Sequence, residues 1–120
     1  RVDHSAGCIE GIGRQRVEPS FLPDIIDRME IVEDIHSIAA AHEVSARLGR
    51  SCGGSTGTNV WAALTLLREM RAAGQAGSVA TLICDGGERY LDTYYDDAWI
   101  ASQGLDLTPY LVSLQEFTRD

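Results

Sequence analysis

The fold of this chain depends most on one stretch, Ser51-Cys52-Gly53-Gly54-Ser55-Thr56-Gly57-Thr58-Asn59. Small and hydroxyl-bearing residues are concentrated there, directly before a segment with the apolar spacing of an amphipathic helix. Glycines let a backbone approach a ligand closely, and a helix N-terminus offers free N–H groups and a positive dipole end. The stretch therefore predicts a site for a polar or anionic group. A glycine-rich helix cap without any ligand is the commoner explanation of such a pattern.

Two well-known motifs resemble this stretch by letter, and the rest of the sequence argues against both. A nucleotide-binding P-loop needs a lysine, but all ten basic residues of the chain are arginine. Gly53, Ser55 and Gly57 match the nucleophile elbow G-x-S-x-G, which requires a preceding strand and a histidine later in the chain. The histidines all come before the serine: His4, His36 and His42. A hydrolase that uses Ser55 therefore stays only as an alternative.

Composition limits the class of protein further. With 120 residues and 44% hydrophobic residues, the chain is long enough for one domain with its own core. Its formal charge of −8 disfavours nucleic acid and acidic membrane surfaces as partners. No apolar run is long enough to cross a bilayer, so we expect a cytoplasmic protein. Cys8, Cys52 and Cys84 show neither a disulfide framework nor metal-ligand spacing, and we expect no metal.

Apolar periodicity predicts two principal helices. The first runs from Asp34, as N-cap, to Leu48, and Gly49 ends it. The second begins after Ser55 and runs to about Ala73. Before them, we expect a short helical turn after Asp24 and a short strand over residues 30–33.

The segment Ser78–Cys84 is almost continuously apolar, as in a central parallel strand buried on both faces. Ligands of open α/β sheets bind beyond the carboxyl ends of strands, so Asp85–Arg89 is a second candidate site region. The aromatic residues that follow are typical of short helices packed on the body of a protein.

Three motifs taken together resemble one enzyme family. They are Glu10-Gly11-Ile12-Gly13, Gly53-Gly54-Ser55-Thr56-Gly57-Thr58 and Gly87-Glu88-Arg89-Tyr90-Leu91-Asp92-Thr93. In this order and spacing they are similar to the carboxyl-terminal part of pyridoxal-phosphate-dependent cysteine synthases and cystathionine β-synthases. The resemblance covers residues 8 to about 100. Within it, Val17-Glu18-Pro19 and Tyr94-Tyr95-Asp96-Asp97 resemble an actinobacterial branch that includes cysteine desulfhydrases.

The resemblance implies an α/β fold, as part of the three-layer sandwich of fold type II pyridoxal-phosphate enzymes, with mostly parallel strands. It implies that Ser55 contacts the pyridine nitrogen of the cofactor and that Cys84 and Asp85 line the same edge. Gly11 would lie near the cofactor and contact it through backbone groups. At Gly86 this sequence departs from the family, which usually has serine or another larger residue there.

The family also requires a lysine for covalent attachment of the cofactor and an upstream phosphate-binding loop, and this chain has neither. We therefore expect a piece of a larger enzyme, homodimeric when whole, that acts on cysteine, serine or O-acetylserine. The 120 residues alone are expected to be inactive. A stand-alone module that binds a ligand or a partner without catalysis is the alternative.

Overall fold

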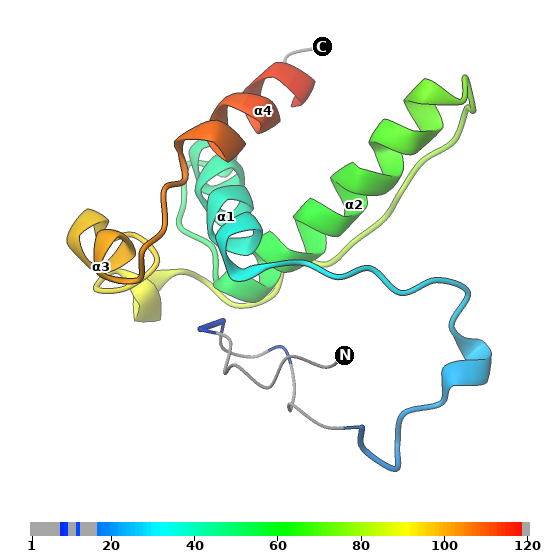
Figure 1. Cartoon of the computed structure of the whole chain (residues 1–120), viewed down its shortest axis with the longest axis horizontal. Helices are drawn as coiled ribbons and strands as arrows, with labels where there is room; N and C mark the ends of the chain where they lie inside the picture. The colour runs from blue at the N-terminus through cyan, green and yellow to red at the C-terminus, as the bar shows by residue number, and fades with distance from the viewer. Residues whose placement is uncertain (1–7, 10–11, 13–16, 119–120) are drawn as a thin grey trace.

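A computed structural model describes residues 8, 9, 12 and 17–118 of the chain. Figure 1 shows its helices around a central α1. The elements, in chain order, are η1 (Pro23–Ile25), α1 (Asp34–Leu48), α2 (Gly54–Ala72), η2 (Glu88–Tyr90), α3 (Asp97–Ser102) and α4 (Thr108–Thr118). Among the described residues, no helix is long and apolar enough to span a membrane.

Helix α1 has the predicted length, but its first turn differs from the prediction. Gly49 ends the helix in the left-handed conformation, with φ of 70°, which glycine adopts at little steric cost. Asp34 is not the N-cap. Glu33 takes that position, and Asp34 is the first helical residue, whose Oδ2 accepts the backbone N–H of Cys8 at 2.7 Å. The Asp34 side chain therefore links the start of α1 to Cys8.

Helices α1 and α2 cross at a close contact made possible by a glycine. A Cβ atom on Gly57 would lie 1.8 Å from the carbonyl oxygen of Ser37. Beside this point, the hydroxyls of Ser37 and Thr58 are 2.6 Å apart and share a hydrogen bond. The glycines of the opening motif therefore serve helix packing as well as any ligand.

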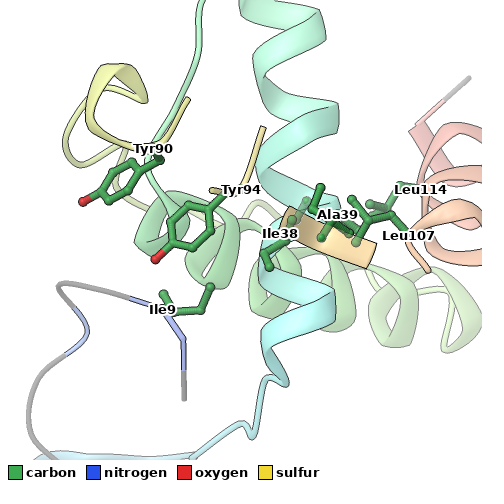
Figure 2. Packing of buried hydrophobic residues seen from close by; sticks show 9 residues of the cluster. Ile9, Ile38, Ala39, Tyr90, Tyr94, Leu107 and Leu114 are labelled. Carbon is green, nitrogen blue, oxygen red and sulfur yellow. The ribbon is translucent and has the colours of Figure 1, made fainter. Parts of the chain in front are cut away.

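The core lies where α1 meets α4 and the loops on its other side, as Figure 2 shows for part of the cluster. Ile38 of α1 is fully buried, and Leu114 of α4 is 1% exposed. The other buried members are Ile9, Ala39, Ala40, Tyr90, Tyr94, Ile100 and Leu107. Burial of such side chains is the main favourable term in folding, at about 1.5–3 kcal/mol for each large one.

The prediction of a strand over Ser78–Cys84 is wrong for this structure. The segment runs extended along α2 (Figure 1), but it has no β-ladder, and Leu82 and Ile83 are 73% and 48% exposed. A parallel strand needs neighbouring strands for its hydrogen bonds and its burial. The described residues supply no neighbouring strand, so this segment, whose sequence suits the centre of a sheet, lies along α2 instead. For the same reason residues 30–33 do not form a strand, and the three-layer sandwich is not seen in the described residues.

Candidate functional site

The opening motif and the segment after the extended run meet at the N-terminus of α2. Cys52 and Gly86 form an isolated antiparallel bridge. The N–H of Gly53 donates to the carbonyl of Asp85 at 3.1 Å, and the N–H of Gly87 donates to the carbonyl of Ser51 at 3.0 Å. Two regions more than thirty residues apart in sequence thus form one structural unit, which we call the α2 turn (residues 51–56 and 84–87).

Side chains of α2 hold the extended segment against the helix. Thr56 is fully buried, and its Oγ1 accepts the backbone N–H of Cys84 at 2.9 Å. One turn further on, Asn59 Nδ2 donates to the carbonyl of Leu82 at 3.2 Å. These bonds satisfy part of a backbone that has no sheet partner, and they fix the position of Cys84 beside the helix.

Glycines lie where the two segments of the α2 turn approach each other. A Cβ atom on Gly53 would lie 2.2 Å from Oδ1 of Asp85. A Cβ atom on Gly87 would lie 2.5 Å from that of Ser51 and 2.9 Å from the backbone nitrogen of Cys52. A larger residue at Gly87 would push the segments apart, whereas one at Gly53 would displace the Asp85 carboxylate.

A tyrosine from beyond the motifs fixes the start of the α2 turn. The hydroxyl of Tyr95 donates to the carbonyl of Cys52 at 2.5 Å and accepts the N–H of Cys52 at 3.1 Å. Ser45 Oγ lies 2.7 Å from the same hydroxyl and 3.0 Å from the Cys52 nitrogen. Burial raises the pKa of Tyr95, so the hydroxyl stays neutral and keeps its proton for the carbonyl.

The carboxylate of Asp85 has a second tyrosine as its partner. The hydroxyl of Tyr90 donates to Asp85 Oδ2 at 2.8 Å. The ring of Tyr90 stacks on that of Tyr94, with centroids 4.8 Å apart, and the hydroxyl of Tyr94 donates to the carbonyl of Cys8. The segment near Cys8 and the α2 turn are thereby linked through two buried rings.

The residues predicted for the site lie as follows. Ser55 is half-buried in the first turn of α2, and its side chain forms no hydrogen bond within the part of the chain that is described. Cys84 and Asp85 are exposed and lie in the segment bonded to that turn. The structure therefore brings these three positions to one end of α2. Gly11 lies outside the described residues.

Sequence reasoning missed the residues that hold this arrangement together. Thr56, Asn59, Tyr90 and Tyr95 act through partners 5 to 43 residues away. Thr56 and Asn59 were within the motif, and the helical spacing of three that separates them was a usable signal. Nothing in the sequence pairs Tyr95 with Cys52.

The two histidines of α1 pack against aromatic rings. His36 stacks on Trp61 with centroids 4.2 Å apart, and His42 stacks on Tyr95 at 4.9 Å. His42 also lies at one wall of a cavity of about 230 Å³, which α3 and the start of α4 complete. No residue of the α2 turn lines this cavity. No group of three metal-ligating side chains occurs among the described residues.

The first turn of α2 can donate a hydrogen bond to a bound acceptor. Gly53 provides no side-chain cap for the first N–H groups of α2, and the Ser55 hydroxyl is a donor without a partner among the residues described. A pyridine nitrogen is an acceptor of this kind, so the residues present fit the ring edge of pyridoxal phosphate. The described residues include no lysine, in keeping with the sequence.

Comparison with known proteins identifies relatives over most of the chain. It is 59% identical, over 92% of its length, to L-cysteine desulfhydrase Cds1 of Mycobacterium tuberculosis. It is 39% identical, over 78% of its length, to an N-(2-amino-2-carboxyethyl)-L-glutamate synthase of Cupriavidus metallidurans. It is 30% identical, over 87% of its length, to cysteine synthase 1 of Emericella nidulans. The chain spans 30%, 27% and 28% of these relatives. No protein-family model matches it.

Proposed function

Because the chain belongs to the family of cysteine synthases and cysteine desulfhydrases, we propose that it is part of a pyridoxal-phosphate enzyme of cysteine metabolism. The observation that carries this proposal is the α2 turn, where Ser55 of the glycine-rich stretch is brought together with Cys84 and Asp85 at the end of the extended segment. Substrates would be amino acids with a leaving group on the β-carbon: cysteine, serine or O-acetylserine.

Ser55 is proposed to donate its hydroxyl proton in a hydrogen bond to the pyridine nitrogen of the cofactor. The hydroxyl has no competing partner in the described residues, and helix α2 holds its backbone rigidly. A serine hydroxyl cannot transfer a full proton to the ring as a carboxylic acid can. Pyridoxal phosphate, when bound, supplies the electron sink for loss of the α-proton and of the β-substituent. Ser55 limits the strength of that sink, which suits β-elimination.

Cys84 and Asp85 are proposed to line the same edge of the cofactor. The bond from the Cys84 N–H to Thr56 places both residues beside the first turn of α2. Gly11, outside the described residues, is proposed as a backbone contact.

Release of sulfide from cysteine is the first reaction to test, because the relative with 59% identity carries the name L-cysteine desulfhydrase. Cysteine synthesis by β-replacement is the second, since relatives named cysteine synthase match at 30–38% identity. Both reactions pass through the loss of a β-substituent, so one site serves either.

The architecture of the whole protein is part of the proposal. The chain is proposed as the carboxyl-terminal portion of a fold type II catalytic domain, in a cytoplasmic homodimer. The extended Ser78–Cys84 would there pair with strands from the rest of the domain, which would bury Leu82 and Ile83. The exposure of these two side chains supports this. Without a lysine, the 120 residues alone cannot attach the cofactor covalently.

The test compares the 120-residue chain with the product of its whole reading frame. We expect the longer protein to be reduced by borohydride to a stable lysine adduct of the cofactor and to release sulfide from cysteine. The 120-residue chain should do neither. A reading frame that is limited to these residues, with a ligand bound but no turnover, would instead support the stand-alone binding module. Esterase activity lost in Ser55→Ala would support the hydrolase.

A further inference from the structure

Asp85 has an unusual combination of exposure and fixed geometry. Asp85 is exposed, yet its Oδ2 accepts a hydrogen bond from the hydroxyl of Tyr90 at 2.8 Å. Its backbone carbonyl accepts one from the N–H of Gly53 at 3.1 Å. Its other oxygen, Oδ1, occupies the space that a side chain on Gly53 would need. An exposed aspartate ordinarily samples several rotamers, so these contacts hold this carboxylate in one of them.

The group that holds Asp85 is itself rigid. Tyr90 is 5% exposed, and its ring stacks on that of Tyr94, which is 2% exposed (Figure 2). Its backbone N–H donates to the carbonyl of Gly87 at 2.9 Å, within the α2 turn. The position of the hydroxyl is therefore set by the protein core and by the turn together.

The partner of this carboxylate is neutral. No arginine forms an ion pair with Asp85 among the residues that the structure describes, whereas Glu43 and Glu69 each pair with one. A hydroxyl donor orients a carboxylate without cancelling its charge. Asp85 thus presents an oriented negative charge at the end of α2 where Ser55 lies.

We propose that Tyr90 is a positioning residue of the site: it holds the Asp85 carboxylate where this charge stabilises a protonated, cationic group of the bound cofactor or substrate. This inference rests on the proposed function. A nearby carboxylate raises the pKa of a cationic acid because it favours the charged form. Ser55 alone, as a neutral donor, has no such effect, so the pair Tyr90–Asp85 would set the protonation state that Ser55 cannot.

The experiment uses the product of the whole reading frame and follows the visible absorbance of bound pyridoxal phosphate against pH. Tyr90→Phe keeps the stacked ring and removes the hydroxyl. We expect it to shift the spectral transition to lower pH, because the carboxylate is then no longer held beside the cationic group whose charged form it favours. Asp85→Asn should shift the transition in the same direction. Tyr90→Phe should then add little in the Asp85→Asn background, because both changes remove the same charge effect.

Tyr94→Phe is the matched control, since it alters the stacked neighbour, whose hydroxyl donates to Cys8 and not to Asp85. It should lower the urea midpoint without moving the spectral transition. An unchanged transition in Tyr90→Phe, or equal shifts in both tyrosine variants, overturns the inference. If Tyr90→Phe does not fold, Asp85→Glu takes its place in the test, because it keeps the negative charge but displaces it from the Tyr90 hydroxyl. A spectral transition at the same pH as in the wild type would then contradict the positioning role of Tyr90. A wild-type protein without cofactor absorbance would refute the proposed function itself.

Discussion

The backbone of Gly57 in α2 lies directly against the carbonyl of Ser37 in α1, with room for a hydrogen and no more. A Cβ atom there would be 1.8 Å from that oxygen and 2.9 Å from the nitrogen of Ala41. Both neighbours are backbone atoms of a helix, so neither can rotate away. The crossing of the two longest helices therefore depends on this one glycine.

We expect Gly57→Ala to lower the free energy of unfolding by about 3 kcal/mol or more, because the helices must separate to admit the methyl group. Urea denaturation followed by circular dichroism measures this. Gly104→Ala is the control: Gly104 has φ of 72° but open space around its Cβ position. That change should cost about 1–2 kcal/mol, from backbone strain alone. A Gly57→Ala variant as stable as the control would contradict the close crossing.

The sequence predicted α1 and α2 almost to the residue, because apolar periodicity and Gly49 are local signals. It did not predict that Asp34 would bond to Cys8, nor that Ser78–Cys84 would lie on a helix. Strand character depends on neighbours that local sequence does not specify. In the site, Ser55 and Cys84 came from the family resemblance, whereas the contacts of Thr56 and Tyr95 depend on the three-dimensional fold.

Tyr95→Phe tests the anchor of the α2 turn. The variant keeps the ring stacked on His42 and leaves the carbonyl of Cys52 without its donor. We expect a loss of about 1–3 kcal/mol in the free energy of unfolding, the usual cost of an unsatisfied, partly buried carbonyl. Ser45→Ala should cost less, because Tyr95 still bonds to both backbone atoms of Cys52. The reverse order would show that the serine is the anchor.

Stability should fall at alkaline pH through Cys8. Burial first, and then the hydrogen bond and charge of Asp34, raise the pKa of this thiol from 9.0 to about 12. Between these values the unfolded chain releases the proton and the folded chain keeps it, so unfolding is favoured as pH rises. The contribution is complete below pH 9.0 and is lost progressively toward pH 12. The pKa of Tyr95 is also raised, which acts in the same direction.

Urea midpoints measured below and above pH 9.0 test this dependence. Cys8→Ser should flatten the decline in part, leaving the share due to Tyr95. A decline of equal steepness in Cys8→Ser would exclude the thiol as a cause.

The cysteines should react with iodoacetamide in an order set by exposure. Cys84 is exposed, Cys8 is half-buried with a raised pKa, and Cys52 is buried with 1% exposure. Alkylation requires both access and the thiolate form. Mass spectrometry of peptides should show Cys84 modified first and Cys52 only on unfolding. Early modification of Cys52 would mean that the α2 turn opens readily.

Thr56→Val tests whether Thr56 holds the extended segment in place beside Ser55. Valine has nearly the same volume, so the fully buried site stays filled, but the Cys84 N–H loses its acceptor. That N–H must then stay unsatisfied, at about 1–3 kcal/mol, or turn to water as the segment detaches. In either case the exchange of the Cys84 amide with deuterium, measured by NMR, should be about ten-fold faster. Ser55→Ala, one residue away in the same helical turn, removes a hydroxyl without a partner in the described chain and should leave that rate unchanged. Faster exchange in both variants would show that the first turn of α2 opens as a whole, and that the Thr56 hydroxyl alone does not place Cys84.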